Sequence, residues 1–410
     1  MTDPATDLVH HPYRAPEGFD AAQTPTHRAS SVFFASMADL RRRTWVDKTT
    51  YTYGLHGTPT TFVLEAQLAT LEHAKHVILV PSGLSAITTI DTAFLKTGDT
   101  VLLPDNAYGP NKDFTRHELA NWGIAHALYD QQDVASLAAR LDDKVKLVWL
   151  EVPGSVTLEF PDLPALVRCI RERAPQAIVA LDNTWGAGLA FNPFELEGGL
   201  TVDVTAHALT KYPSGGSDVL MGSIACRDDA LYDTLAWTHG RLGLGVGPDD
   251  VSMVLRSLPS IALRYAAQDA SCRQIATWLQ GQPGVQRVLC PALPGSPGHA
   301  HWARLCTQAA GLLTIEFDAR YTRDQVDAFV DALTRFRIGW SWGGAVSMVT
   351  VYQAARPRST VLKSETADLR SLPTPYAGVL VRLCIGLEGT PDLIADLAQA
   401  WAQLPALAQA

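Results

Sequence analysis

The sequence has no apolar run that approaches the length needed to cross a membrane. A membrane-spanning helix requires about 20 apolar residues, and the first twenty residues here are polar, without the apolar core of a secretory signal. We therefore expect a cytoplasmic protein that does not bind membranes. A broad basic patch is also absent, because the net charge is −9 and the densest basic run is the three arginines at 41–43. We therefore expect no nucleic-acid partner.

Cysteine is scarce, and its spacing excludes a disulfide framework. Six cysteines are spread between residues 169 and 384, and none belongs to a Cys-x-x-Cys pair. This spacing predicts reduced, mostly buried thiols, as is usual in a cytoplasmic protein. The twelve histidines show no metal-ligand spacing, so we expect no bound metal.

The composition is that of a globular protein. Hydrophobic residues make up 47% of the 410 residues and charged residues 18%, which excludes a largely disordered chain. A chain of this length exceeds one small core and predicts more than one domain. We find no internal repeat and no low-complexity segment.

Short apolar runs alternate with helical patterns between residues 60 and 225. Runs with few charges predict strands at 76–83, 99–105, 146–153, 177–185 and 202–211. Helical patterns between them include 84–98, 111–123 and 162–175. Near-continuous apolar strands that alternate with helices indicate a parallel sheet covered on both faces. Ligands of such sheets bind at the carboxyl ends of the strands.

The pattern changes towards the C-terminus. A long helical stretch covers 249–281 and is interrupted at Pro259. Beyond it, strands are predicted at 311–318 and 378–388, followed by a terminal helix. We therefore predict an α/β protein made of three parts. These are an N-terminal arm at 1–57, a large domain at 58–257 and a smaller C-terminal α/β domain at 258–410.

Two polar features at predicted strand ends could hold parts of a ligand. The first is Ser82–Gly83, between a strand and a helix, where backbone N–H groups and the helix N-terminus would hold an anion. The second is Asp182, a carboxylate that ends an apolar strand. A buried carboxylate needs a partner, and a protonated heterocyclic nitrogen, an arginine or backbone amides would each serve.

Two cations complete the pattern. Lys211 is predicted to end a buried strand, where loss of water destabilises its ammonium and suits it to Schiff-base chemistry. Arg382 lies among apolar neighbours, and its planar fork would bind a carboxylate. Taken singly, they could be a surface lysine and half of an internal ion pair. Together with the anion cradle and Asp182, they supply what pyridoxal phosphate and an amino acid require.

Several motifs extend this pattern along nearly the whole chain. They are HRASSVFF, YGLHGTPTTFVLE, PSGLSAI, DNAYGP, LDNTWGAG, TKYPSGGSD, PALPGSPGH, SWGG and RLCIGLE. On these motifs the chain resembles the Cys/Met-metabolism (transsulfuration) family of pyridoxal-phosphate enzymes, and within it the bacterial β-lyases. The resemblance implies the aspartate-aminotransferase-like fold, called fold type I. Its large domain has a mainly parallel central sheet, and its smaller C-terminal domain is α/β.

The resemblance also implies roles around the cofactor, pyridoxal 5'-phosphate. Lys211 would bond to the cofactor aldehyde and act as general base. Asp182 would pair with the pyridine nitrogen, and Tyr108 would stack on the ring and assist proton transfer. The residues expected around the phosphate are Gly83, Leu84, Thr210 and, from a neighbouring subunit, Tyr53. The active sites would therefore form in a homodimer, two of which usually make a homotetramer.

On the substrate side, the resemblance implies that Arg382 binds the α-carboxylate. Relatives that act at Cγ tend to carry glutamate just before the serine of the Ser-x-Gly-Gly segment, whereas this chain has Trp340 there. Trp340, Ser341 and Trp342 are therefore expected to form the aromatic wall of a β-acting enzyme. The competing interpretation makes the two tryptophans part of the core.

The chain departs from the family pattern near the phosphate. The family usually has Tyr-x-Arg in the arm, whereas Leu55 follows Tyr53 and Gly54 here. A charge-assisted hydrogen bond worth about 1.5–3 kcal/mol is lost, for which His56 and Lys112 are candidate substitutes. Ala208 and Val152 also stand where polar residues are common. Backbone N–H groups and Thr210 are therefore expected to make a larger share of the hydrogen bonds to the phosphate.

The expected reaction is cleavage of cystathionine to homocysteine, pyruvate and ammonia, a step of methionine biosynthesis by a carbon–sulfur lyase. A γ-acting relative, namely a cystathionine γ-synthase, a γ-lyase or a sulfhydrylase, remains an alternative. A broad lyase of cysteine S-conjugates or cystine shares the same chemistry, and an alanine racemase side reaction shares its first steps. From another class, a non-catalytic or regulatory protein that binds pyridoxal phosphate also remains open.

Overall fold

The computed structural model of the protein describes residues 3–10, 17–18, 21–352, 354–356, 372–373 and 375–405. Every residue predicted to form the site lies in these ranges. Parts of the predicted arm and of the predicted C-terminal domain lie outside them, at 1–2, 11–16, 19–20, 353, 357–371, 374 and 406–410. No helix of the described part is long and apolar enough to span a membrane. All six cysteines are buried and unpaired, as predicted.

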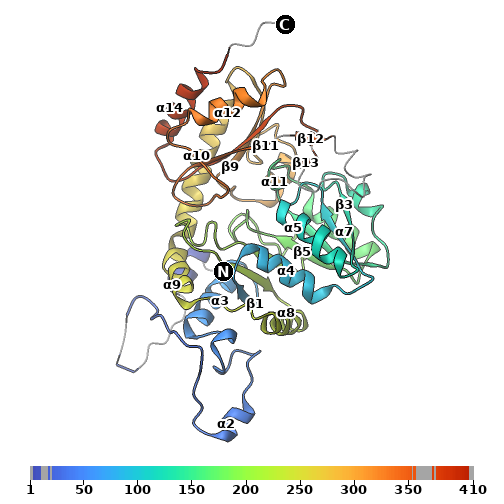
Figure 1. The fold of residues 1–410 in the computed structure, drawn as a ribbon, viewed down its shortest axis with the longest axis vertical. Helices are drawn as coiled ribbons and strands as arrows, with labels where there is room; N and C mark the ends of the chain where they lie inside the picture. The colour runs from blue at the N-terminus through green and yellow to red at the C-terminus, as the bar shows by residue number, and fades with distance from the viewer. Residues whose placement is uncertain are drawn as a thin grey trace.

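Seven strands form the larger sheet, in the spatial order β1-β7-β6-β5-β4-β2-β3. Figure 1 labels β1, β5 and β3 of this sheet. They are β1 His76–Val80, β2 Thr100–Pro104, β3 Ala125–Tyr129, β4 Val145–Glu151, β5 Ile178–Asp182, β6 Val204–His207 and β7 Gly222–Cys226. Neighbours from β6 to β3 are parallel, whereas β7 is antiparallel to β1 and β6. The predicted parallel sheet is therefore confirmed, but two of its strands were not predicted: β3, which is parallel and lies at one edge, and β7, which is antiparallel. No helix lies between β6 and β7 to make the crossover that a parallel pair needs.

Helices cover both faces of this sheet, as predicted. They are α3 Pro59–Leu71, α4 Gly83–Phe94, α5 Gly109–Phe114, α6 Val134–Ala138, α7 Leu163–Arg173, α8 Asp229–Leu242 and α9 Pro248–Ser257. The predicted helix at 111–123 is α5 continued by a π-helical turn at Thr115–Leu119. Alternate residues of a strand point to opposite faces. Trp149 of β4 therefore joins the cluster with α4 and α8, while Val148 joins the one with α3 and α7.

A second sheet of five strands follows, in the order β10-β11-β14-β9-β8. Its strands are β8 Val285–Leu289, β9 Leu312–Phe317, β10 Arg337–Ile338, β11 Met348–Tyr352 and β14 Leu380–Cys384. The other elements of this part are α10 Ile261–Gln280, α11 His299–Leu305, α12 Arg323–Asp331, α14 Thr390–Trp401 and the pair β12 Ala354–Arg356 and β13 Leu372–Pro373. The predicted break at Pro259 is the short 3-10 turn Leu258–Ser260 between α9 and α10. The second sheet lies beyond the predicted domain boundary, which itself stays a prediction.

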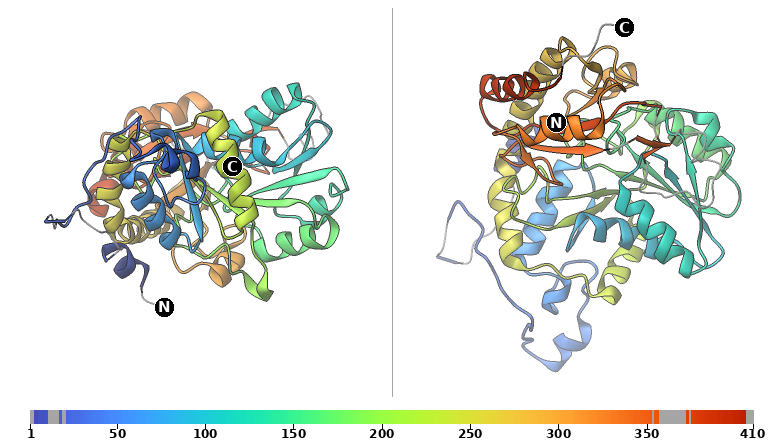
Figure 2. Two further views of the ribbon diagram at one scale, coloured as in Figure 1. Left: turned by 90° about the horizontal axis from the view of Figure 1, so that it is seen from below. Right: turned by 45° about the horizontal axis from the view of Figure 1, so that its top comes forward.

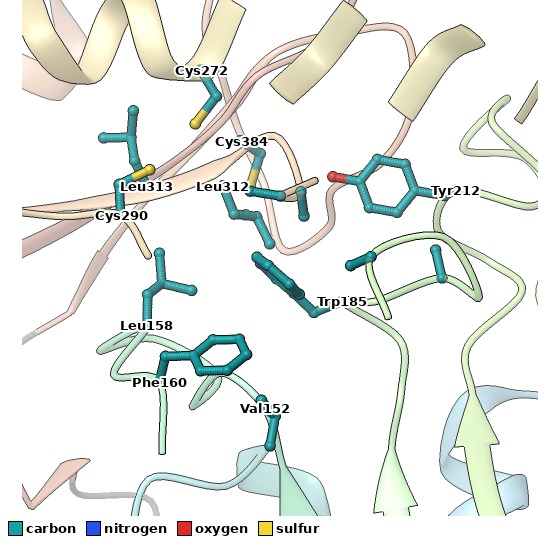
Figure 3. Packing of buried hydrophobic residues seen from close by; sticks show 14 of the residues in the cluster. Val152, Leu158, Phe160, Trp185, Tyr212, Cys272, Cys290, Leu312, Leu313 and Cys384 are labelled. Atoms are coloured by element: carbon teal, nitrogen blue, oxygen red, sulfur yellow. The ribbon is translucent and has the colours of Figure 1, made fainter. Parts of the chain in front are cut away.

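An apolar cluster joins the two parts of the chain (Figure 3). Phe160 and Trp185 come from loops of the larger sheet, and Leu312 and Cys384 come from strands of the second sheet. Tyr212, from the loop after β6, points into the same cluster. The second sheet is therefore held against the carboxyl ends of the larger sheet's strands.

The N-terminal segment divides into two parts. Helix α1, Pro4–Val9, packs on α3 and buries Leu8. The segment that carries α2, Met37–Arg42, instead projects from the rest of the chain in two views (Figures 1 and 2). Phe33 in this segment is 96% exposed. Met37 and Tyr53 are exposed as well, and a gathering of exposed apolar side chains is typical of a contact with another molecule. The predicted contact with a neighbouring subunit stays a prediction.

Asp91 of α4 gives a test of the packing between α4 and β4. It is fully buried, and its carboxylate accepts a 2.8 Å hydrogen bond from Trp149 Nε1. Burial raises the pKa of Asp91 from 3.8 to about 7. The folded protein therefore keeps a proton between pH 4 and 7 that the unfolded chain has lost. Over this window the free energy of unfolding falls by about 1.4 kcal/mol per pH unit on account of this group.

We predict that Asp91→Asn removes this pH dependence, because the amide stays neutral and its oxygen can still accept from Trp149. Chemical denaturation at pH 5, 6, 7 and 8 measures it. From pH 5 to 7 the free energy of unfolding should fall more steeply for the wild type than for the variant. Above pH 7 the difference between the two proteins should stay constant. Parallel pH profiles for the two proteins would contradict the prediction.

Candidate active site

Three strand ends and one helix start converge at one edge of the larger sheet. Glu151 and Asp182, the last residues of β4 and β5, are register partners, and Asp182 pairs with Ala206 of β6. The start of α4 reaches the same edge, because a Cβ on Gly83 would lie only 2.5 Å from the Cβ of Ala208. The predicted cradle and Asp182 therefore lie beside the loop that carries Lys211.

Lys211 lies in a turn beyond β6, so its predicted place at a strand end is wrong. Strand β6 ends at His207, four residues earlier. The chain turns because the N–H of Ala208 donates to Thr184 Oγ1 and the N–H of Lys211 donates to the carbonyl of Ala208, each at 3.0 Å. Because of these two bonds the backbone leaves the hydrogen-bond ladder of the sheet after His207, so Lys211 lies outside the strand.

The Lys211 side chain is held in a half-buried position. Its Nζ donates a 3.1 Å hydrogen bond to Ser341 Oγ and lies 5.5 Å from the ring centroid of Trp342. Burial lowers the pKa of Lys211, and the nearby Arg382 guanidinium lowers it further. A lowered pKa increases the neutral amine fraction, which is the form that attacks an aldehyde or takes a proton.

Two carboxyl groups share this edge. Burial raises the pKa of Asp182, although two hydrogen bonds from Thr184 favour its charged form. Burial raises the pKa of Glu151 well above its usual range, and the Asp182 charge adds to this effect. Burial and the neighbouring carboxylate therefore both act on the pKa of Glu151 in the same direction. The sequence prediction missed it, although it ends the apolar run LVWLE just as Asp182 ends its own.

Glu151 also positions Tyr108. The backbone N–H of Tyr108 donates to Glu151 Oε2 at 2.7 Å, directly before α5. Burial raises the pKa of Tyr108, and the charges of Asp182 and Glu151 add to the effect. Tyr108 is therefore a neutral phenol, close enough to Asp182 for that carboxylate to raise its pKa, and 39% of it is exposed.

Arg382 enters the site from the second sheet. It lies in the middle of β14, is 5% exposed and donates from Nη1 to the carbonyl of Ser155 at 3.1 Å. Its Nε is buried and has no partner among the described residues. An unpaired buried guanidinium N–H is costly, and a ligand carboxylate would satisfy it.

The helix start at Ser82 leaves donors free for an anion. Ser82 Oγ accepts the N–H of Ser85 at 3.0 Å, while the N–H groups of Gly83 and Leu84 have no partner within the described chain. The Thr210 hydroxyl, also predicted here, donates to the carbonyl of Met221 at 3.3 Å. It would therefore have to rotate before it could donate to a phosphate.

The segment Trp340–Ser341–Trp342 lies at the site. Trp340 is 77% exposed, which excludes a place in the core. Trp342 is half-buried and packs against the core cluster, with its ring centroid 5.6 Å from that of Tyr212, so the competing interpretation holds in part for this residue. A Cβ on Gly343 would lie 2.8 Å from the backbone nitrogen of Tyr212, so this segment packs directly on the lysine loop.

The arm residues do not reach the site within this chain. Tyr53 is 50% exposed and forms a β-bridge with Ser31 of the arm itself. Leu55 packs on Gly245. The two suggested substitutes for the missing arginine are held elsewhere. His56 stacks on Trp45, and Lys112 is buried and donates to the carbonyl of Asp105 at 2.8 Å.

The donors and acceptors described here fit pyridoxal phosphate and an amino acid. The free amides at Gly83 and Leu84 match a phosphate, and the buried acid Asp182 matches a protonated ring nitrogen. Lys211 has the lowered pKa that bonding to an aldehyde requires. The unpaired Nε of Arg382 matches the α-carboxylate of an amino acid.

Comparison with known proteins identifies relatives over almost the whole chain. The family model of the Cys/Met metabolism PLP-dependent enzymes matches residues 5–402. The cystathionine beta-lyase of Bordetella avium is 36% identical over 397 residues, which cover 95% of this chain and 94% of that protein. The cystathionine beta-lyase of Salmonella typhimurium is 34% identical over 357 residues, 86% of each chain.

A solved structure agrees with these relatives. The cystathionine gamma synthase of Xanthomonas oryzae pv. oryzae in complex with cystathionine superposes with a TM-score of 0.85 at 29% identity. The superposition covers 98% of each chain. β-acting and γ-acting enzymes therefore both occur among the relatives.

The close approach of Gly83 to Ala208 allows a test of whether the phosphate binds at the helix start Ser82–Leu84. In Gly83→Ala the added Cβ would lie 2.5 Å from the Cβ of Ala208, so the helix start must shift. Overpacking of this kind costs about 1–3 kcal/mol, so we expect the dissociation constant of pyridoxal phosphate to rise by about tenfold or more. Titration of the apo-protein with the cofactor measures it.

Ala208→Gly supplies the matched control. In the double variant the contact between the two Cβ atoms is gone, so cofactor affinity should return part of the way to that of Ala208→Gly alone. Unchanged affinity in Gly83→Ala would show that the phosphate does not bind at this helix start.

Proposed function

The chain belongs to the Cys/Met-metabolism family of pyridoxal-phosphate-dependent enzymes, and on this premise we propose that it is a lyase that cleaves the Cβ–S bond of cystathionine. Its cofactor is pyridoxal 5'-phosphate, and its fold is fold type I. The products would be homocysteine, pyruvate and ammonia, with one water consumed. Homocysteine is the methionine precursor, which would give the enzyme a place in methionine biosynthesis.

The assignment to Cβ chemistry is carried by Trp340. γ-acting relatives tend to have glutamate at this position, and a carboxylate there could move protons at Cβ and Cγ. Here the side chain is an indole that is 77% exposed next to Ser341, the hydrogen-bond partner of Lys211. An indole can accept no proton from substrate, which supports elimination directly from Cβ.

Pyridoxal phosphate, when bound, withdraws electrons from Cα of the amino acid and so makes the Cα proton acidic. Asp182 would hold the proton of the ring nitrogen on which this effect depends. Arg382 would orient the substrate by binding its α-carboxylate through the free Nε. The free amides at Gly83 and Leu84 would hold the phosphate.

Lys211 would move the protons of the reaction. Its Nζ takes the Cα proton as general base, and the 3.1 Å hydrogen bond to Ser341 Oγ holds Nζ in place. The proton then returns to the departing sulfur, so that a neutral thiol leaves. Tyr108 is a second donor for this step, because its raised pKa keeps the phenol protonated.

We also propose that the active sites are shared within a homodimer that assembles into a homotetramer. Tyr53 is half exposed on the arm, and the segment of the arm that carries α2 projects from the rest of the chain (Figure 1). Tyr53 would reach the phosphate of the neighbouring subunit, where Leu55 leaves no arginine to assist it.

Analysis of the products from L-cystathionine tests the proposed reaction. We expect the purified protein with added pyridoxal phosphate to release pyruvate and homocysteine in equal amounts, with little 2-oxobutyrate. Lys211→Ala should lower the rate by about 10²-fold or more, because it removes the general base. Pyruvate can be read with lactate dehydrogenase and 2-oxobutyrate by chromatography.

Two results would contradict the proposal. Mostly 2-oxobutyrate would mean that the enzyme acts at Cγ despite Trp340. A protein that binds the cofactor but yields neither product from cystathionine, cystine or other cysteine S-conjugates would indicate a non-catalytic protein.

A further inference from the structure

Glu72 and His207 form a buried acid–base pair that the proposed reaction does not use. Both side chains are completely buried, and His207 Nδ1 lies 2.7 Å from Glu72 Oε1. Glu72 directly follows α3, whereas His207 is the last residue of β6. The other carboxylate oxygen of Glu72 accepts a 3.0 Å hydrogen bond from Thr205 Oγ1. The pair therefore joins the end of a covering helix to the strand end that precedes the lysine loop.

The burial of Glu72 favours a charged form of His207. An ionised carboxylate without a partner is costly inside a protein, and His207 is the ion-pair partner of Glu72 in the described part of the chain. Histidine can take the compensating proton near neutral pH. Its Nε2 and Ser223 Oγ are both buried without a partner among the described residues, and His207 and Ser223 are register partners. Register partners point to the same face of a sheet, so Ser223 is the available acceptor for a second N–H of His207.

His207 also lies beside Asp182 in the sheet. Asp182 pairs with Ala206, the residue directly before His207. Neighbouring residues of a strand point to opposite faces, so His207 acts on Asp182 through its charge and not through a hydrogen bond. Burial raises the pKa of Asp182, and the charge of His207 lowers it. Glu72 comes from the helix that covers the far face, so the imidazolium is the member of the pair nearer to Asp182.

We propose that Glu72 keeps His207 charged, and that this imidazolium holds Asp182 as an anion, so that the proton shared with the cofactor stays on the ring nitrogen. The inference rests on the proposed pairing of Asp182 with that nitrogen. A positive charge disfavours a proton on a nearby carboxyl group, and the ring nitrogen lies farther from His207 than Asp182 does in this pairing. His207 is therefore a positioning residue, because it acts on the cofactor through Asp182.

The other ionisable groups around Asp182 have the wrong sign, change during the reaction or carry no charge. Glu151, its register partner in β4, opposes the anion when it is ionised. Lys211 lowers the pKa of Asp182, but it would bond to the cofactor and move protons, so its charge changes. Tyr108 is a neutral phenol. His207 would contact neither cofactor nor substrate, so its charge stays constant through the reaction.

Nitrogen NMR of the holoprotein with isotopically labelled histidine measures the charge of His207. We expect both ring nitrogens of His207 to carry a proton at neutral pH. Their signals are assigned by their loss in His207→Gln. In Glu72→Gln the carboxylate is gone, and His207 should lose one of its two protons. A neutral His207 in the wild-type protein would overturn the inference.

Nitrogen NMR of pyridoxal phosphate labelled at its ring nitrogen measures the consequence. We expect a protonated ring nitrogen in the wild type and a shift towards the neutral form in His207→Gln. Glutamine can still donate to Glu72 but carries no charge. The double variant Glu72→Gln/His207→Gln keeps a neutral hydrogen-bonded pair, so it should fold even if the unpaired Glu72 does not allow His207→Gln to fold. An unchanged ring-nitrogen signal in the His207 variants contradicts the proposal.

Lys75→Gln is the matched charge control. It removes a cation whose side chain is 56% exposed and pairs with Asp229, directly before β1 and at the opposite end of the sheet from the site. The ring-nitrogen signal should not move in this variant. An equal shift in Lys75→Gln and His207→Gln would mean that the effect is not specific to His207, and the inference would fall.

Steady-state kinetics with cystathionine separate this inference from the proposed function. We expect kcat of the His207 variants to fall by about 3- to 10-fold, which corresponds to about half to one pKa unit at Asp182. KM should change little, because Arg382 would still bind the α-carboxylate. If no substrate is cleaved, both NMR measurements still decide the inference. If cystathionine is cleaved while His207 is neutral, the proposed function stands and the inference is wrong.

Discussion

The burial of Tyr212 is the constraint on which the candidate site depends. Its hydroxyl accepts the N–H of Gly311 at 2.7 Å from the second sheet, and its carbonyl accepts from Arg264 of α10 at 2.7 Å. The side chain is almost completely buried in the cluster between the two sheets (Figure 3). Because Tyr212 directly follows Lys211, these bonds fix the lysine backbone where the two sheets meet.

The chemistry of the other groups follows from this position. Packing the second sheet over the strand ends removes water, so the pKa of Lys211 falls while those of Asp182, Glu151 and Tyr108 rise. The same packing brings Arg382 from β14 to the larger sheet. An amine with a lowered pKa, a buried acid and an unpaired guanidinium donor therefore lie together only because both sheets are present.

The sequence predicted those features that are local to one segment. Apolar runs identified the larger sheet's parallel strands apart from β3, and the polar residues at their ends identified Asp182. β7 was missed because its small residues, GSIAC, make a weak apolar signal. Lys211 was misplaced because β6 ends early, where the N–H of Ala208 donates to Thr184 Oγ1 instead of to a neighbouring strand. Glu151 was missed although it ends an apolar run as Asp182 does, and only the fold shows that it pairs with Asp182 and accepts the N–H of Tyr108.

The central claim is that Lys211 bonds to the cofactor. Reduction of the holoprotein with sodium borohydride traps this bond, and mass spectrometry of the digested protein locates the modified residue. We expect one pyridoxyl-phosphate group per chain, on Lys211. Modification of another lysine, such as the buried Lys112, or of none, would contradict it.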